Sequence, residues 1–322
     1  MKYYMGIDLG GTNIAVGVVD EDFRLVGTHS VPTGRFRPFE EVVADMARAA
    51  RDTAARCGLG LEDFGSVGVG LPSSIHPKTG RVVFANNLGW RDAPFVEEFS
   101  KHIPKPIHVA NDADCAALAE SLAGAGRDYP TVFMVTLGTG LGGGYVHHGK
   151  LFLGGSGLGI EPGHITIVHG GAPCTCGSPG CLEAYASVTA LIRETIEAMA
   201  ADPRTLMRDI CGNDISKVDG RTAFDAAAQG DGAARGVVER YIGYLATGLR
   251  SLITIFRPHA VVVGGGLCAQ GETLLAPLRA KVAKYLYAAD IFPPPDIVRA
   301  GLGNDAGIIG AALLETQAVR DS

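Results

Sequence analysis

The sequence predicts an α/β protein of two domains with a cleft between them. The chain has 322 residues, of which 47% are hydrophobic, so it is long enough for two cores. A strand, a glycine turn and a second strand open the chain at 3–19, and the same pattern recurs at 129–148. A third apolar run, 260–263, also ends in glycines, at 264–266. A repeated hairpin of this kind indicates a duplicated α/β domain.

The first half contains short apolar runs bounded by turn residues and two alanine-rich segments with helical spacing. The runs predict strands at 3–9, 14–19, 24–31, 66–70 and 107–110. The alanine-rich segments predict helices at 39–57, which ends near Gly58, and at 113–123. Gly10, Gly11 and Thr12 form the tight turn between the first two strands.

The second half is expected to begin with a strand at 129–137, a glycine turn at 138–143 and a strand at 144–148. A strand is expected at 260–263, and the apolar stretch 306–314 is expected to be a helix. We expect an N-terminal domain at 1–120 and a C-terminal domain at 121–305. The last segment, 306–322, is expected to return to the first domain.

Charge and hydropathy argue against several classes of partner. The formal net charge is −6 and is spread without a basic block, which disfavours nucleic acid and anionic membranes. No apolar run has the length of a membrane span. The N-terminal segment MKYYMGIDLGG lacks the apolar core of a signal peptide, so we expect a cytoplasmic protein.

The glycines at 138–144 match two known nucleotide-binding spacings, and neither fits its context. Gly138-x-Gly140-x-x-Gly143 has the spacing of a dinucleotide fingerprint, but a short strand-like segment follows it where a helix is required. Gly144 through Gly149-Lys150 resembles a P-loop, but Leu151 stands where Ser or Thr is needed. Without Cβ atoms, such turns instead allow successive backbone N–H groups to approach an anion. The turns at 10–13 and 138–143 are therefore predicted to hold the β- and γ-phosphates of ATP.

Three of the seven cysteines form one cluster, Cys174-x-Cys176-x4-Cys181, and the other four are isolated. In a reducing compartment such a cluster indicates metal ligation. Tetrahedral zinc requires a fourth ligand. His164 and His169 both lie near enough in sequence to supply it.

Transfer of phosphate to a hydroxyl requires a base and a cation. Asn111 and Asp112 directly follow a predicted strand, where active sites of α/β folds collect. Asp112 could instead cap the following helix, although Asp114 is better spaced for that task. Asp8 ends the first strand beside a phosphate turn and is expected to organise Mg²⁺ through water.

Six motifs together resemble the ROK family of sugar kinases and related transcriptional repressors. In chain order these are DLGGTN near the N-terminus, ND at 111–112, LGTGLGGG at 137–144, EPGH at 161–164, CTCGSPGCLE at 174–183 and VVVGGG at 261–266. The resemblance covers essentially the whole chain. It implies the two-domain actin-like ATPase fold, which is ribonuclease H-like, with an interdomain cleft.

The resemblance also implies roles for individual residues and for three cofactors, ATP, Mg²⁺ and a structural Zn²⁺. Asp112 is the implied general base, and His164 is the implied fourth zinc ligand beside Cys174, Cys176 and Cys181. The implied sugar-binding residues are Asn87, Asn111, Asp112, Glu161, His164 and Glu183. The implied nucleotide-binding residues are Asp8, Gly10, Gly11, Thr12, Asn13, Gly138, Thr139, Gly140, Gly264, Gly265 and Gly266. Ser73, Ser74, Asn86 and Trp90 are further candidates for sugar contacts.

By this resemblance the chain is an ATP-dependent hexose kinase, and the block GCLEAYAS favours D-glucose, phosphorylated at C6. Fructose, allose, mannose, N-acetylmannosamine and N-acetylglucosamine remain alternative substrates. A ROK transcriptional repressor is disfavoured, because the phosphate turn begins at Gly10 and leaves no room for a DNA-binding module before it. A non-catalytic sugar sensor is disfavoured, because both phosphate turns and Asp112 are present. The expected partners are a sugar and ATP, and the expected assembly is a homodimer or a dimer of dimers.

Overall fold

The computed structural model describes residues 2–34, 36–85 and 88–317. Contacts divide the chain into two compact units. Unit 1 comprises Met1–Val132, Gly144–Ile160 and Gly301–Ser322, and unit 2 comprises Phe133–Gly143 and Glu161–Ala300. The first unit thus extends past the expected boundary at residue 120 and also includes the segment 144–160.

The central sheet of unit 1 has five strands in the order β3-β2-β1-β4-β8. Their bounds are β1 Tyr3–Leu9, β2 Asn13–Val19, β3 Leu25–Pro32, β4 Phe64–Leu71 and β8 Ile107–Asn111. The first three strands are antiparallel neighbours. β4 is parallel to both β1 and β8. The carboxyl ends of β1, β4 and β8 therefore lie at the same edge of the sheet.

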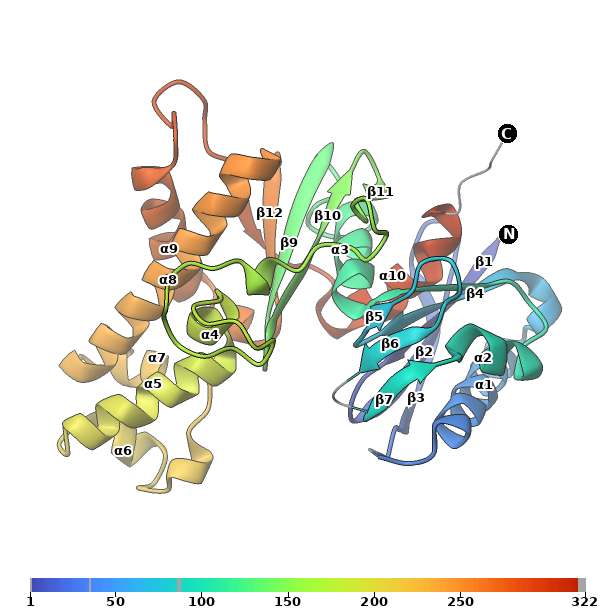
Figure 1. The fold of residues 1–322 in the computed structure, drawn as a ribbon, viewed down its shortest axis with the longest axis horizontal. Coiled ribbons are helices and arrows are strands. Elements are labelled where there is room, and N and C mark those ends of the chain that lie inside the picture. Colours follow the sequence, from blue (N-terminus) through green and yellow to red (C-terminus); the bar gives the residue numbers. More distant parts are fainter. Residues whose placement is uncertain (1, 35, 86–87, 318–322) are drawn as a thin grey trace. The chain divides into compact units, whose positions relative to one another are not determined.

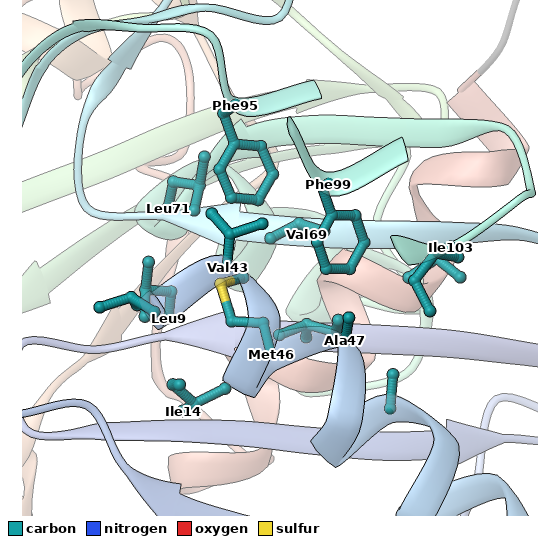
Figure 2. Packing of buried hydrophobic residues seen from close by; sticks show 14 of the residues in the cluster. Leu9, Ile14, Val43, Met46, Ala47, Val69, Leu71, Phe95, Phe99 and Ile103 are labelled. Carbon is teal, nitrogen blue, oxygen red and sulfur yellow. The ribbon is translucent and has the colours of Figure 1, made fainter. Parts of the chain in front are cut away.

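Helices cover both faces of this sheet (Figure 1). They are α1 Phe39–Arg56, α2 Phe95–His102, α3 Asp112–Leu122 and α10 Ala306–Leu313. Side chains alternate between faces along a strand, so Met5, Ile7 and Leu9 point to one core. Figure 2 shows this core, where Met46 of α1 and Phe99 of α2 pack near Val69 of β4. The opposite face packs against α3 and α10.

A small antiparallel sheet in unit 1 consists of β5 Ser74–Ile75, β6 Val82–Ala85 and β7 Trp90–Ala93. Trp90 is buried, and its ring packs edge-on against Phe39 with centroids 4.9 Å apart. Trp90 therefore belongs to the core in this structure, although the sequence had made it a candidate for a sugar contact.

The second sheet has the order β11-β10-β9-β12-β13. Its strands are β9 Thr131–Leu137, β10 Leu141–His147, β11 Lys150–Leu151, β12 Ala260–Gly264 and β13 Asp296–Arg299. Counted along the chain within each sheet, both sheets follow the order 3-2-1-4-5. The shared order extends the duplication well beyond the two hairpins that the sequence revealed.

Six helices belong to unit 2 in the described part of the chain. They are α4 Glu183–Ala186, α5 Val188–Ala201, α6 Leu206–Ile210, α7 Thr222–Ala228, α8 Gly232–Phe256 and α9 Glu272–Tyr285. Short 3₁₀ helices occupy Leu61–Asp63, Pro162–His164, Ile215–Lys217, Gly266–Gln270, Gly303–Asp305 and Leu314–Gln317. Among the described residues, none of the helices is both long and apolar enough to cross a bilayer.

The second glycine turn is shorter than the sequence suggested. β10 begins at Leu141, so the turn spans only 138–140, and Gly142, Gly143 and Gly144 lie inside the strand. Close packing explains why two of these positions are glycine. A Cβ on Gly143 would lie 2.2 Å from the Met134 carbonyl oxygen, and a Cβ on Gly144 would lie 2.7 Å from Cβ of Ala117.

Candidate active site

The first glycine turn of unit 1 joins β1 to β2 and is closed by backbone hydrogen bonds. The Gly10 N–H donates to the Asn13 carbonyl at 2.8 Å. Thr33, which follows β3, donates its N–H to the Thr12 carbonyl at 2.8 Å and its hydroxyl to the Gly10 carbonyl at 2.7 Å. The side chains of Thr12 and Asn13 are exposed. The turn thus has a fixed backbone and an open outer surface.

Two carboxylates lie next to this turn. Asp8 is in the last part of β1, and Asp112 is the first residue of α3, which begins where β8 ends. Burial raises the pKa of Asp8 from 3.8 to about 6, and the negative charge of Asp112 adds to the rise. Parallel pairing of β1, β4 and β8 brings the two groups together, because it places the carboxyl ends of β1 and β8 at the same edge of the sheet. Active sites of α/β folds collect at this edge.

The cap of α3 is Asn111, not Asp114 as the spacing had suggested. The Asn111 side chain accepts the Ala113 N–H at 2.8 Å, and Asp112 accepts the same N–H at 2.8 Å. Asp114 is instead buried in the first turn of the helix. The Asn111 amide also donates to the Ser73 carbonyl at 3.4 Å, which places buried Ser73 beside the candidate site.

Asn111 lines a hollow of about 910 Å³ in unit 1. Ile75, Pro77, Asp114 and Leu158 are among its other walls. Asn86 and Asn87, predicted from the sequence as possible sugar ligands, lie outside the described residues. Ser74 is in β5 and is exposed.

The second glycine turn belongs to unit 2 and is held from two directions. Val188 N–H donates to the Gly138 carbonyl at 2.8 Å, and the Thr189 hydroxyl donates to the Thr139 carbonyl at 2.7 Å. On the other side, the Leu141 N–H donates to Oε2 of Glu183 at 2.9 Å. Sequence reasoning did not find Val188 or Thr189, because they belong to no motif and their partners are backbone carbonyls of the turn.

A hollow of about 320 Å³ in unit 2 adjoins this turn. Gly138, Thr139, Val188, Arg221, Gly266 and Gln270 are among the residues that line it. Gly265 has a positive φ of 87°, and a Cβ there would lie 2.3 Å from the Leu137 carbonyl oxygen. The glycines after β12 are thus packed against the end of β9, beside the turn. Arg221 was not predicted from the sequence.

One histidine and three cysteines of unit 2 form a compact cluster. The ligand atoms of His164, Cys174, Cys176 and Cys181 all lie within 4.8 Å of one another. Nδ1 of His164 is 3.6 Å from Sγ of Cys174, and the thiols of Cys176 and Cys181 are also 3.6 Å apart. His169 is not in this group among the described residues. One nitrogen and three sulfurs form a complete donor set for tetrahedral zinc.

The chain around the cluster is stabilised by tight turns. Gly177 and Gly180 have φ values of 92° and 84°, which glycine adopts without a steric penalty. The backbone N–H of Ser178 lowers the pKa of the Cys176 thiol, which favours the thiolate that binds metal. Burial has the opposite effect on Cys181 and raises its pKa to about 12.

Glu183 connects this cluster to the second glycine turn. Its Oε1 is 3.2 Å from the Thr175 hydroxyl and 3.7 Å from Sγ of Cys174, while its Oε2 accepts the Leu141 N–H. A Cβ on Gly163 would lie 2.1 Å from the Leu141 carbonyl oxygen, so the 161–164 segment packs against the same place. Partial burial raises the pKa of Glu161, opposed by His164 and reinforced by the charge of Glu183.

The predicted residues are therefore grouped within each unit. Unit 1 contains the first turn with Asp8, Asn111 and Asp112. Unit 2 contains the second turn, the 264–266 glycines, Glu161, Glu183 and the histidine–cysteine cluster. A glycine turn and acidic side chains together form a group suited to phosphate and hydroxyl chemistry in each unit.

Comparison with known proteins gives consistent matches over the whole chain. The family model described as "ROK family" matches residues 4–318. A glucokinase of Thermotoga maritima is 38% identical over 309 residues, which cover 96% of this chain and 95% of the relative. A ROK family glucokinase from Streptomyces griseus, solved with glucose and AMPPNP, has a TM-score of 0.82 and 36% identity, covering 97% of this chain and 98% of that chain. A ROK hexokinase from Thermus thermophilus has a TM-score of 0.82 and 34% identity, covering 99% and 100%.

Proposed function

Because the chain belongs to the ROK family and has the actin-like ATPase fold of its sugar kinases, we propose that it is an ATP-dependent hexose kinase that phosphorylates D-glucose at C6. The observation that carries this proposal is the pair of carboxylates, Asp8 and Asp112, beside a glycine turn in unit 1. Phosphoryl transfer needs phosphate held by N–H groups, a cation and a base for the hydroxyl proton.

Asp112 acts as the general base. Its carboxylate accepts the proton of the C6 hydroxyl, and the hydroxyl oxygen forms a bond to the γ-phosphorus. The bond from that phosphorus to the oxygen that bridges the β- and γ-phosphates breaks, and ADP leaves. Asn111, which caps the same helix, is fixed at the adjacent position and would hydrogen-bond the sugar.

The glycine turns hold the phosphates. Thr12 and Asn13 in one turn, and Thr139 and Gly140 in the other, supply backbone N–H groups, and the neighbouring glycines allow the phosphates to approach them. Mg²⁺, when bound, would neutralise phosphate charge, and Asp8 would orient it through water. The hollow of about 320 Å³ beside Gly138 and Gly266 supports placing the adenosine there.

The histidine–cysteine cluster fits a structural zinc ion. His164, Cys174, Cys176 and Cys181 would complete its coordination, so no position is left for a reactive water. The ion would fix the 161–183 segment, and Glu161, His164 and Glu183 on that segment would bind sugar hydroxyls. The expected homodimer or dimer of dimers and the cytoplasmic location belong to the same proposal.

The proposal is tested with a coupled ATP-to-ADP assay on glucose, fructose, mannose, allose and the two N-acetylhexosamines. Glucose should give the highest kcat/KM, because a site built to pair hydroxyls discriminates against sugars that leave a polar group unpaired. Fructose or an N-acetylhexosamine exceeding glucose by about tenfold would favour another hexose kinase.

The role of Asp112 is tested in the same assay with Asp112→Asn. Turnover should fall by about 10²–10⁴ while glucose affinity stays within several-fold, because an amide can hydrogen-bond the hydroxyl but cannot accept its proton. Asp128→Asn, on an exposed loop, serves as the control. Near-normal turnover in Asp112→Asn would place the base elsewhere.

A further inference from the structure

The second glycine turn has two consecutive carbonyls occupied by the start of one helix. The Gly138 carbonyl accepts the Val188 N–H at 2.8 Å, and the Thr139 carbonyl accepts the Thr189 hydroxyl at 2.7 Å. Val188 and Thr189 are the first two residues of α5, whose own N-cap is Ser187. One donor is a fixed backbone group, whereas the other is a side chain that the sequence is free to change.

These two bonds determine the direction of the N–H groups in the turn. The peptide bonds of the described turn are trans, and in a planar trans peptide the C=O and the next N–H point in opposite directions. Since both carbonyls point to α5, the N–H groups of Thr139 and Gly140 point away from it. Two successive N–H groups directed to one side are the arrangement that binds anions.

Rotation of the Thr139–Gly140 peptide would reverse this arrangement. Its carbonyl oxygen, which carries partial negative charge, would then face the phosphate in place of an N–H. Gly140 has no Cβ to resist such a rotation. The Thr189 hydroxyl is the group whose hydrogen bond opposes it.

A similar pair of hydrogen bonds is present at the first glycine turn, where the donors come from a different structural element. Thr33 donates its N–H to the Thr12 carbonyl and its hydroxyl to the Gly10 carbonyl. In each unit, therefore, two turn carbonyls accept one N–H and one threonine hydroxyl. Both donors belong to Thr33 in unit 1, whereas in unit 2 they belong to the neighbouring residues Val188 and Thr189. Thr33 follows a strand and Thr189 begins a helix, so the shared feature is the hydrogen bonding and not the local fold.

We propose that Thr189 is a positioning residue for nucleotide binding, which keeps the Thr139–Gly140 peptide oriented with its N–H toward the phosphates. The inference rests on the proposed use of ATP and adds a residue to it. Thr189 is exposed, so its hydroxyl is not required to satisfy a buried core. Its effect should therefore appear in nucleotide affinity and not in stability.

The test compares Thr189→Val with Thr189→Ser and Thr195→Val. Valine keeps the branched shape and removes the hydroxyl, whereas serine keeps the hydroxyl. Thr195 is the control, because it lies in the same helix but is buried, and its hydroxyl donates within α5, to the Leu191 carbonyl at 2.7 Å. The measurements are AMPPNP affinity by calorimetry, KM for ATP and for glucose, kcat and melting temperature.

Thr189→Val should weaken AMPPNP binding and raise the KM for ATP by about threefold to tenfold, the usual effect of one lost hydrogen bond. The KM for glucose and the melting temperature should not change, and Thr189→Ser should bind AMPPNP like the wild type. Thr195→Val should lower the melting temperature without changing AMPPNP affinity.

Unchanged AMPPNP affinity in Thr189→Val, or a serine variant as weak as the valine variant, would overturn the inference. Equal losses of AMPPNP and glucose affinity would also overturn it, since they would indicate a general structural role. If the wild type itself did not bind AMPPNP, the proposed function would fail first. The wild-type measurement thus separates the two failures.

Discussion

Asp8 is in an environment that disfavours its charged form. Burial and the charge of Asp112 raise its pKa from 3.8 to about 6. A carboxyl group with a raised pKa binds its proton more tightly in the folded state, so folding is penalised as pH rises through this range. The penalty is absent below about pH 4 and complete above about pH 6. A residue kept at such a cost is typical of a functional site.

Asp8→Asn should therefore stabilise the protein in the absence of nucleotide and Mg²⁺. We expect about 1–3 kcal/mol at pH 7.5 and no gain at pH 4, from a shift of about two pKa units. Turnover should fall at every pH, because Mg²⁺ would lose the carboxylate proposed to organise it. Urea unfolding at the two pH values measures the effect, with Asp128→Asn as the exposed control. Equal stability of Asp8→Asn and wild type at pH 7.5 would show that burial of this carboxylate costs nothing.

Residues that belong to a chemical motif could be predicted from the sequence, whereas residues whose role depends on tertiary contacts could not. The Asp112 position and the Cys174-Cys176-Cys181 spacing are visible as letters, because carboxylates and thiols carry the chemistry themselves. The contacts of Val188 and Thr189 depend on where α5 begins relative to a turn 50 residues earlier, as the bond from Thr189 to Thr139 shows. The packing of Trp90 likewise depends on tertiary contacts.

At the scale of elements, α10 is placed by glycines on the strands beneath it. Ideal Cβ atoms on Gly6 and Gly68 would lie 2.1 Å from the Ile308 carbonyl oxygen and 1.7 Å from the Ala311 carbonyl oxygen. On the helix itself, a Cβ on Gly310 would lie 1.7 Å from the Cys115 carbonyl oxygen of α3. These glycines allow the helix backbone to lie directly against β1, β4 and α3.

Gly68→Ala should destabilise unit 1 strongly, because the methyl group can be accommodated only if α10 moves. We expect a loss of about 3 kcal/mol or more, at the upper end of overpacking effects. Gly243→Ala is the matched control, since it lies inside α8 and a Cβ there meets nothing within 4 Å. It should add about 0.5–1 kcal/mol by removing a helix-interior glycine. The stabilities are compared by urea unfolding followed by circular dichroism. A Gly68→Ala midpoint equal to that of the wild type would refute the close packing of α10.

The limits of prediction differ between elements for a physical reason. Strand β1 and helix α1 follow directly from apolar periodicity, and their expected bounds differ from the observed ones by at most one residue. Glycine is ambiguous, because a missing Cβ serves a turn and a close contact equally well. Gly143 therefore resembled part of a turn in the sequence, although it lies in β10 against Met134.

At the scale of the whole molecule, the duplication detected from two hairpins extends to two sheets with the same strand order. The two units nevertheless contain different candidate functional residues. The Asp8–Asp112 pair lies in unit 1, and the histidine–cysteine cluster lies in unit 2. The unit boundaries could not be predicted, because the chain crosses between units at Val132, Gly143, Ile160 and Ala300 without any change in composition.

Because the histidine–cysteine cluster lies in unit 2, we expect metal removal to lower the stability of unit 2 and not that of unit 1. The only tryptophan, Trp90, is buried in unit 1 and reports on that unit alone, whereas helices α4–α9 of unit 2 contribute much of the far-ultraviolet circular dichroism. The wild type should contain one zinc ion per chain, and Cys176→Ser should lose both the ion and kinase activity, because the 161–183 segment is no longer held.

In Cys176→Ser, the urea midpoint reported by Trp90 fluorescence should stay at the wild-type value, while the midpoint of the dichroism signal falls. Cys57→Ser is the control, because Cys57 lies in unit 1 outside the cluster and its loss should leave the zinc content intact. Metal analysis and the two spectroscopic titrations on the same samples provide the comparison. A joint fall of both midpoints would mean that the units unfold as one body, because loss of an ion held entirely by unit 2 would then destabilise the surroundings of a tryptophan in unit 1. Full activity in a metal-free Cys176→Ser protein would instead show that Glu161 and Glu183 are held in place without the ion.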